Sequence, residues 1–182
     1  MKLSKDKIEV REVNSNDVKE IYKWRNHDLT RPMMHNTKHI TWASHNEWFN
    51  KSIKDPKHYS LICYNTDEKK IGIVSFNLFR DYAVISIIID PVLRGKKISF
   101  YCLKKSIRFF SNKFDKIKKI KAEIKNFNEA SKKIFIKAGF KLKEEKNDIM
   151  LFELNLKMSL QPKVSTRCGL LHIFGALILQ FW

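Results

Sequence analysis

The stretch IIIDPVLRGKKISFYCLKKSIRFF, residues 87–110, decides the fold because it joins the two kinds of element that the chain uses. A β-branched run stops at Asp90, and a basic, glycine-containing turn leads into a segment with apolar residues at helical spacing. A helix N-terminus presents unpaired N–H groups and the positive end of the helix dipole. Arg94, Lys96 and Lys97 add charge at this point. The stretch therefore predicts a strand, an anion-binding turn and a helix, suited to a phosphate or pyrophosphate.

Length and composition indicate one folded domain with a substantial core. The chain has 182 residues, of which 43% are hydrophobic and 12% aromatic, and this excludes a disordered chain. Its net charge of +17 is compatible with nucleic acid, an acidic membrane surface or polyphosphate ligands. The basic residues are mostly lysines scattered along the chain, without zinc-finger spacing, an RNA-binding aromatic motif or an arginine-rich arm. We therefore interpret the charge as a solvated basic surface, and nucleic acid is not expected as a partner.

The cysteines and the N-terminus indicate a cytoplasmic protein. Cys63, Cys102 and Cys168 are far apart, and none forms a CxxC motif. Cys63 and Cys102 lie in apolar runs and are predicted to be buried free thiols, which is typical of a reducing compartment. The N-terminal sequence MKLSKDKIEV lacks the apolar core of a signal peptide. We expect no metal ion and no membrane contact, unless the C-terminal tail makes one.

Hydrophobic periodicity predicts an α/β chain in which three consecutive strands form an antiparallel meander. Ser44 and Glu47 fit a capping box at the start of one helix. Asn128 is expected to cap the N-terminus of the last helix, and Gly139 its C-terminus. Strands are expected at 7–13, 59–65, 70–79, 82–90, 117–124, 140–146 and 149–156, and helices at 18–26, 44–54, 95–111 and 129–138.

The tail from about residue 158 to 182 differs in composition from the domain at 1–157. Its segment GLLHIFGALILQFW is rich in leucine and contains no lysine. It is shorter than the roughly twenty apolar residues that span a bilayer. Two interpretations are open: an interfacial or partner-binding segment, or a non-native extension such as a frameshifted end. The abrupt change of composition favours the second.

Two motifs resemble those of the GNAT superfamily of N-acetyltransferases. In that family the fourth strand ends in a loop of the pattern Arg/Gln-x-x-Gly-x-Gly/Ala, whose amides hold the acetyl-CoA pyrophosphate. Here Lys97 stands where the middle glycine is usual. A side chain there restricts the backbone, although its ammonium could contact the phosphate. The matching residues are Arg94, Gly95, Lys96, Lys97, Ile98 and Ser99.

The second motif in the family is Asn-x-x-Ala/Ser-x-x-x-Tyr-x-x-x-Gly-Phe, and Asn128, Ser131, Phe135, Gly139 and Phe140 have that spacing. The resemblance implies that Asn128 and the following helix line the pantetheine arm. Phe135 stands where a tyrosine often protonates the leaving thiolate, and phenylalanine cannot donate a proton. The loss need not abolish activity, because a thiolate with a pKa near 8.5 is a tolerable leaving group.

The resemblance covers roughly residues 8–156 and implies fold, cofactor and reaction. The implied fold is an α/β (α+β) GNAT fold with a mixed central sheet of about seven strands flanked by four helices. Acetyl-CoA is the implied acetyl donor, and its pantetheine is expected to pair with the backbone of Ile87, Ile88 and Ile89. An amine would then attack the thioester directly, with the enzyme supplying proximity.

The segments WRNH at 24–27 and MMHNTKHITWASHNEWF at 33–49 are similar to acetyltransferases of nucleotide-linked amino sugars in pseudaminic and legionaminic acid biosynthesis. The implied acceptor is a sugar such as UDP-4-amino-4,6-dideoxy-N-acetyl-altrosamine, in surface or flagellin glycan biosynthesis. Arg25 suits its diphosphate, Met34 and Trp48 suit its base, and His45 suits a phosphate, a hydroxyl or a proton.

Other interpretations stay open at this point. Trp48 at helical spacing is often a core residue, His45 could be a surface residue of a turn, and Arg25 could complement the helix dipole. The strand at 82–90 carries no carboxylate before Asp90, so the general base is unassigned, and His45 or a water relay are the candidates. A protein N-terminus is an alternative acceptor, and a non-catalytic acyl-CoA or nucleic-acid binding module is an alternative of another class. A homodimer is also left open.

Overall fold

The computed structural model describes residues 8–156, and the order of its helices and strands is the one predicted from the sequence. Short 3-10 helices η2 (Ser15–Asp17), η3 (Arg31–Met33) and η4 (Pro91–Leu93) lie in the connections. The main elements are β1 (Ile8–Glu12), α1 (Val18–Asn26), α2 (Trp42–Ser52), β2 (His58–Asn65), β3 (Lys70–Leu78), β4 (Tyr82–Ile89), α3 (Ser99–Lys113), β5 (Lys119–Lys125), α4 (Glu129–Lys137), β6 (Lys141–Lys146) and β7 (Ile149–Asn155).

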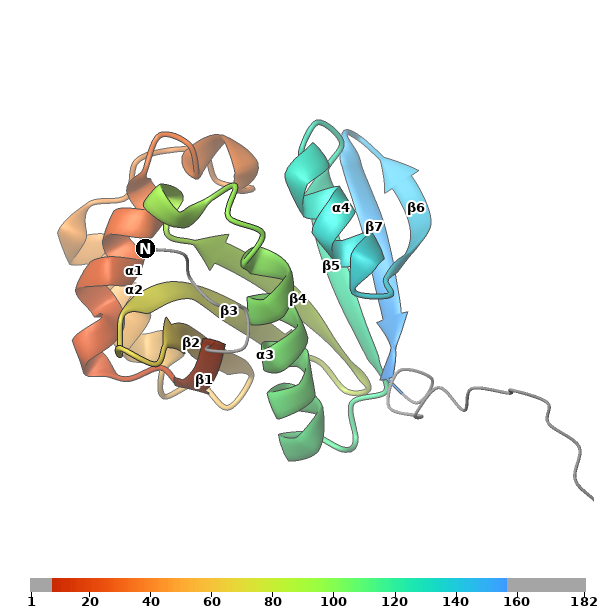
Figure 1. Ribbon diagram of the computed structural model, residues 1–182, viewed down its shortest axis with the longest axis horizontal. Coiled ribbons are helices and arrows are strands. Elements are labelled where there is room, and N and C mark those ends of the chain that lie inside the picture. The colour runs from red at the N-terminus through yellow and green to blue at the C-terminus, as the bar shows by residue number, and fades with distance from the viewer. Residues whose placement is uncertain (1–7, 157–182) are drawn as a thin grey trace, which may run out of the picture.

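All the strands belong to one mixed sheet with the order β1-β2-β3-β4-β5-β7-β6 (Figure 1). The meander β2-β3-β4 is antiparallel, as predicted, and so is the β6-β7 hairpin. Asn147 and Asp148 both have positive φ in the turn of that hairpin, as a tight two-residue turn requires. Among the described strands, β4 and β5 are the one pair of neighbours that run parallel. The expected seven-stranded mixed sheet with four helices is confirmed.

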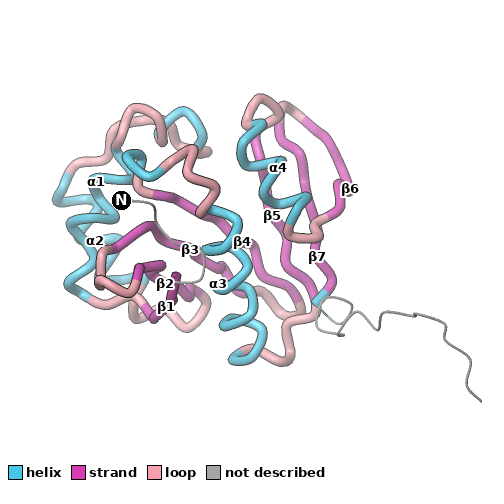
Figure 2. Tube along the Cα trace, in the orientation of Figure 1, coloured by secondary structure: helices cyan, strands magenta, loops and turns pink. Residues whose placement is uncertain are grey.

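Helices cover both faces of the sheet, because successive residues of each strand point to opposite sides. On β4, Ile85 and Ile89 join a large core with α3 and α4, whereas Ile88 joins a smaller core with α1 and α2. In the large core Phe76 of β3 stacks on Phe110 of α3, with ring centroids 4.0 Å apart. Figure 2 shows the helices distributed on the two sides of the strands.

The predicted capping box at Ser44 is wrong, because α2 begins two residues earlier, at Trp42. Thr41 has an extended backbone, and its side-chain oxygen accepts the Ser44 N–H at 3.2 Å. The Thr41 side chain therefore caps the helix and leaves Ser44 inside the first turn. As a result His45 points into the protein, with 2% of its surface exposed, and is not a surface residue.

The helix predicted from residue 95 begins at Ser99. Gly95 and Lys97 have φ of +77° and +59°. These left-handed angles cannot continue into a right-handed helix. The four residues before Ser99 are therefore a loop, and the basic turn of the sequence is a separate structural unit.

Cys63 and Cys102 are buried free thiols, as predicted, and a hydrogen bond between them together with burial raises the pKa of the Cys102 thiol. Cys168 and the apolar tail at 158–182 lie outside the described residues. Within residues 8–156 no helix is long and apolar enough to cross a membrane. In the same range, no cluster of three or more His, Cys, Asp or Glu side chains could hold a metal ion.

Candidate functional site

The sheet opens between its two parallel strands. β4 and β5 pair only through Tyr82–Val84 and Lys119–Lys121, and beyond these residues they diverge (Figure 1). Residues 85–89 of β4 still pair with β3 on their other side, but among the described strands none pairs with them on the side of β5. Ile87, Ile88 and Ile89 thus present a strand edge inside the sheet, which an extended ligand can use for backbone hydrogen bonds.

The loop after β4 leads from this edge to the N-terminus of α3. No side chain caps α3, so its first N–H groups are available to an anion. Lys96 and Lys97 are exposed beside them. Gly95 has open space around the position of a missing Cβ, so its glycine is required by its positive φ and not by crowding.

Arg94 holds this loop against the linker between α1 and α2. One terminal nitrogen of Arg94 donates to the Leu29 carbonyl at 2.8 Å, and the other donates to the Thr30 hydroxyl at 2.6 Å. Burial lowers the pKa of Arg94, and the charge of Asp90 opposes this shift. Because both terminal nitrogens are engaged, the structure gives Arg94 an anchoring place in the loop.

The second motif frames the opposite side of the opening. Asn128 caps α4, and its side-chain oxygen accepts the Ser131 N–H at 3.2 Å. Phe135 is 3% exposed and packs edge-on against Phe140, with ring centroids 4.9 Å apart. Gly139 has φ of +97° just after the helix, in agreement with its predicted role at the helix C-terminus. Phe135 therefore belongs to the core, and its ring has no proton to offer.

The four predicted substrate residues do not form one cluster. Arg25 and His45 are buried near each other, and the charge of Arg25 is one of the causes that lower the pKa of His45, after burial as the main cause. Met34 packs against the smaller core. Trp48 is 48% exposed and lies edge-on to His58, with ring centroids 5.9 Å apart.

Arg25 is buried without a carboxylate partner among residues 8–156. It is 8% exposed, it donates from Nη2 to the Asn36 carbonyl, and its Nη1 has no hydrogen-bond partner in that part of the chain. Burial, followed by the charge of Arg31, lowers the pKa of Arg25. An unpaired buried charge is costly unless a ligand completes it.

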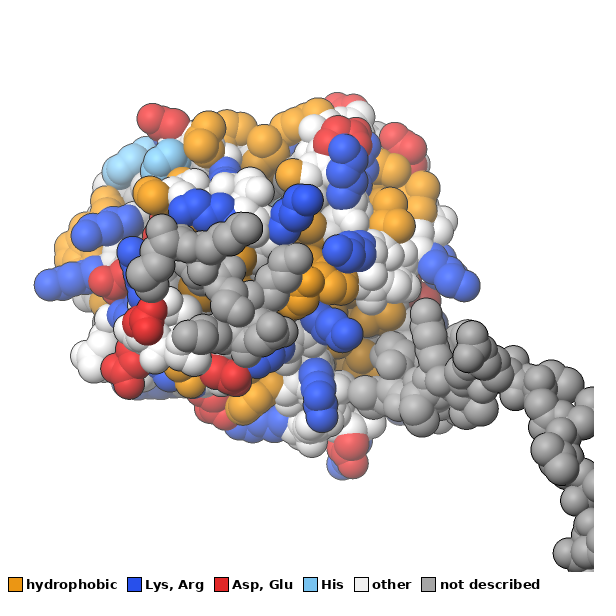
Figure 3. Space-filling model, in the orientation of Figure 1, with side chains coloured by type: hydrophobic (Ala, Val, Ile, Leu, Met, Phe, Trp, Pro, Cys, Tyr) orange, Lys and Arg blue, Asp and Glu red, His pale blue; other side chains and the backbone are white. Residues whose placement is uncertain are grey.

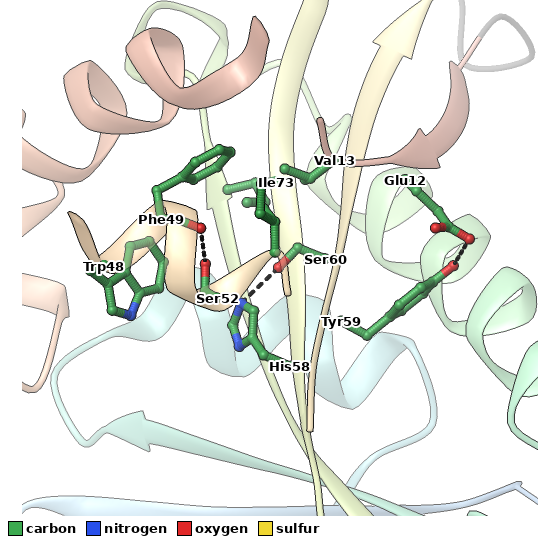
Figure 4. Close-up of a pocket in the computed structure, with 10 residues that line it drawn as sticks. Glu12, Val13, Trp48, Phe49, Ser52, His58, Tyr59, Ser60 and Ile73 are labelled. Atoms are coloured by element: carbon green, nitrogen blue, oxygen red, sulfur yellow. Dashed lines mark hydrogen bonds between the residues drawn. The ribbon is translucent and has the colours of Figure 1, made fainter. Parts of the chain in front are cut away.

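The sequence patterns did not single out His35, Glu123, His58 or Ser60, which the structure places in two polar groups. His35 Nε2 in the linker lies 3.1 Å from a carboxylate oxygen of Glu123 in β5. A small pocket beside α2 is lined by Trp48, His58 and Ser60 (Figure 4). Aligning the strands of the predicted meander would have placed Ser60, Ser75 and Ser86 in one row, whereas nothing local indicates the contact between His35 and Glu123.

Comparisons with known proteins agree with this geometry. Residues 7–141 match the Acetyltransferase (GNAT) domain family. Acetyltransferase PseH of Campylobacter jejuni is 29% identical over 140 residues, which is 75% of this chain and 85% of that protein. A domain from Methanocaldococcus jannaschii superposes with a TM-score of 0.72 at 25% identity, over 82% of this chain and 99% of the other.

Spermidine N-acetyltransferase of Vibrio cholerae, crystallised with CoA and spermine, has a TM-score of 0.78 at 16% identity, over 86% of this chain and 99% of the other. At that identity the likeness concerns the fold. The match to the GNAT domain family covers well over half of the chain, and with it the non-catalytic binding module is set aside. The chain belongs to the GNAT acetyltransferase family and is an acetyl-CoA-dependent N-acetyltransferase.

Proposed function

We propose that the protein transfers the acetyl group of acetyl-CoA to the amino group of a nucleotide-linked amino-dideoxy sugar, such as UDP-4-amino-4,6-dideoxy-N-acetyl-altrosamine. The observation that carries this proposal is the buried, unpaired guanidinium of Arg25. A diphosphate is the natural complement of a guanidinium that has no carboxylate beside it. The resemblance of the segments at 24–27 and 33–49 to acetyltransferases of amino-sugar nucleotides points the same way.

In this proposal acetyl-CoA occupies the opening between β4 and β5. Its pantetheine extends along the free edge of Ile87–Ile89, and its pyrophosphate meets the amides of the loop and the start of α3. The ammonium groups of Lys96 and Lys97 neutralise phosphate charge, and Arg94 keeps the loop in place through Leu29 and Thr30. Asn128 and Ser131 form the wall on the side of α4, and Phe135 packs behind it in the core.

The sugar nucleotide lies on the other face of the sheet, beside the α1–α2 linker at 27–41. Arg25 is attached to this linker because its Nη2 donates to the Asn36 carbonyl, and its Nη1 is the nitrogen that the diphosphate would engage. Met34 and the exposed indole of Trp48 provide apolar surface for the base. The ring of His45 packs between the rings of Tyr22 and Phe49, beneath the surface of this region.

The test is thiol release from acetyl-CoA with a panel of UDP-, dTDP- and GDP-linked 4-amino sugars, each compared with the same amino sugar without its nucleotide. We expect turnover with a sugar nucleotide and a much higher KM for the free sugar. Arg25→Gln should raise KM for the sugar nucleotide at least tenfold and leave KM for acetyl-CoA unchanged. Lys23→Gln, which removes an exposed charge of the same helix, is the matched control.

Equal turnover of the free sugar and its nucleotide would contradict the role of Arg25. Turnover of N-terminal peptides, with none of the sugars, would replace the sugar by the protein N-terminus as acceptor. Spermidine is included because a structural neighbour acetylates it. The net charge of +17 repels a polycation, so we expect little turnover with spermidine.

A further inference from the structure

Four polar side chains form a continuous hydrogen-bonded row on the α1–α2 face of the sheet. Ser60 Oγ lies 2.8 Å from Ser75 Oγ on the neighbouring strand. His58 Nε2 lies 3.0 Å from Ser60 Oγ, and His58 Nδ1 lies 2.7 Å from Asn77 Oδ1. Figure 4 shows the bond between His58 and Ser60 beside Trp48. The row is therefore Ser75, Ser60, His58 and Asn77.

The protonation state of His58 sets the direction of every bond in this row. Asn77 Oδ1 is an acceptor, so Nδ1 of a neutral His58 carries the proton, and Nε2 is free to accept. Ser60 then donates to His58, and the bond to Ser75 is kept when the Ser75 hydroxyl turns to donate, the reverse of the direction from Ser60 to Ser75 in the structure. When His58 is protonated, Nε2 donates to Ser60, and Ser60 donates to Ser75. One proton that enters at Ser75 and arrives at His58 thus reverses both hydroxyl bonds without moving a heavy atom.

The row points to the catalytic opening. Ser75 is paired in register with Ser86 of β4, and Ser86 is exposed on the same face. Side chains that are directly opposite in a sheet have Cβ atoms only about 5 Å apart, so one water can bridge the two hydroxyls. Ser86 lies two residues beyond Val84, the last residue of β4 that pairs with β5. It thus stands where the free edge of β4 begins.

The other end of the row reaches solvent. His58 lines the pocket beside α2, together with Trp48, Ser52 and Glu12. The charged group on this side is Glu12, which accepts a hydrogen bond from Tyr59 at 2.9 Å and forms an ion pair with Lys113. Its charge is thus already compensated, and a proton on His58 can leave to water in the pocket.

We propose that Ser75, Ser60 and His58 form a proton relay that removes the proton released when the amine is acetylated. An ammonium acceptor must lose two protons in all as its N–C bond forms. One of these protons is taken up by the CoA thiolate that forms when the C–S bond breaks. The other proton is surplus and must leave the site. The surplus proton passes through Ser86 and Ser75 to Ser60, whose own proton moves to His58 Nε2. The imidazolium then releases one proton to solvent.

This inference deepens the proposed function, and it rests on acetyl transfer to an amine and not on which amine is used. It addresses two features of the site: β4 carries no carboxylate before Asp90, and Phe135 cannot exchange a proton. His58 does not touch the acceptor in this account. It is a positioning residue that acts through Ser60 and Ser75, so its test needs a readout beyond loss of activity.

The test is the pH dependence of kcat/KM for wild type, His58→Gln, Ser60→Ala and Asn77→Asp. General base assistance contributes about a hundredfold or more to such reactions, so we expect His58→Gln and Ser60→Ala to lower kcat at least tenfold. The carboxylate of Asn77→Asp favours the imidazolium, so the acid limb of the profile should move to higher pH by about one unit. Ser52→Ala is the matched control, since Ser52 lies in the same pocket but bonds only the Phe49 carbonyl.

A purely structural row would lower the melting temperature of the variants and leave the acid limb where it is in wild type, and that result overturns the relay. The profile is measured with whichever amine turns over, so failure of every sugar overturns the proposed acceptor and not the relay. A second measurement needs no turnover. The ¹⁵N chemical shifts of His58 should show the Nδ1–H tautomer at high pH, and an Nε2–H tautomer would overturn the relay, because Ser60 could then not donate to His58.

Discussion

The buried residue His45 makes the stability of the folded protein depend on pH. Burial lowers the pKa of His45, a hydrogen bond with the Val18 backbone opposes this, and the charge of Arg25 adds to the lowering. Its Nε2 is buried without a partner among residues 8–156. Because the folded pKa lies below the unfolded one, the stability that neutral His45 contributes is complete above the unfolded pKa, near 6.5. It is lost as the pH falls through the folded pKa.

We therefore expect His45→Phe to stabilise the protein relative to wild type more at pH 5 than at pH 8. Phenylalanine keeps the ring contacts with Tyr22 and Phe49 and cannot take up a proton. Urea unfolding at both pH values measures the difference, and His27→Gln, at an exposed histidine, is the control. An equal effect at pH 5 and pH 8 would show that His45 does not titrate on unfolding.

Lys97 combines an unfavourable backbone angle with a useful charge. Its φ of +59° costs a residue with a side chain about 1–2 kcal/mol, which glycine avoids at the expense of a more flexible unfolded chain. We expect Lys97→Gly to raise the free energy of unfolding by up to about 1 kcal/mol and to raise KM for acetyl-CoA about two- to fivefold. Lys97→Ala loses the ammonium but keeps the strain, so it should raise KM without the gain in stability. Equal stability of the two variants would argue against strain at this position.

At the scale of elements, Asp17 joins β1, α1 and β3. The Asp17 side chain is fully buried and accepts hydrogen bonds from Arg11 at 2.7 and 2.8 Å and from the Asn14 amide at 2.9 Å, and it pairs with Lys70 at 2.9 Å. Burial alone would raise the pKa of Asp17, but the bonds from Arg11, Asn14 and Lys70 outweigh it, and the pKa lies below its ordinary value. The stability that ionised Asp17 provides is therefore present above the unfolded pKa, near 4, and is lost as the pH falls through the folded pKa.

Asp17→Asn should lower the free energy of unfolding by about 3 kcal/mol at pH 7, because Arg11 and Lys70 lose their shared partner. The difference from wild type should shrink in acid, where the wild-type carboxyl is itself protonated. Chemical denaturation between pH 3 and pH 7 measures it. Asp81→Asn, at an exposed turn, should change little at any pH, and a constant effect of Asp17→Asn across this range would contradict the assignment.

Helices and strands could be predicted from the sequence where their hydrophobic periodicity is clear. Their exact ends and side-chain partners could not, because these depend on contacts with residues far away in the chain. The alternation of Ile85, Ser86 and Ile88 is enough to identify a strand with two different faces. The sequence pattern does not decide the start of α2, because Thr41 and Ser44 both fit a cap and only the extended backbone at Thr41 distinguishes them. The partners of Arg94 lie more than sixty residues earlier in the chain, so no local pattern could show that its guanidinium is already engaged.

The same limit applies to the candidate site. The motifs at residues 94–99 and 128–140 lie on the two sides of the opening of the sheet. They could not reveal that Arg25 is buried without a partner, since burial depends on the linker at 27–41. The serines of the proposed relay look like ordinary polar positions of three separate strands until the register brings Ser60, Ser75 and Ser86 side by side.

At the scale of the whole molecule, lysine and arginine side chains are spread over the visible face and do not gather in one patch (Figure 3). A net charge of +17 still attracts the phosphates of CoA from all directions. Raising the salt concentration from about 0.1 M to about 1 M shortens the Debye length from about 10 Å to about 3 Å. We expect KM for acetyl-CoA to rise severalfold over this range while kcat stays constant. A KM that does not respond to salt would mean that contacts within the opening alone decide the affinity.

The short parallel pairing of β4 and β5 makes the molecule two half-sheets that share one narrow seam. The half with β1 to β4 carries α1, α2 and α3, whereas α4 lies beside β5 and β7 (Figure 1) and also contacts α3. A ligand that pairs with the backbone of Ile87–Ile89 would then act as an additional strand between the two half-sheets. The protein would become more rigid when acetyl-CoA binds and more flexible when CoA leaves. Amide hydrogen exchange at 85–89 and 122–125 should accordingly slow when CoA is added. Each catalytic cycle would then close the gap in the sheet once and open it again.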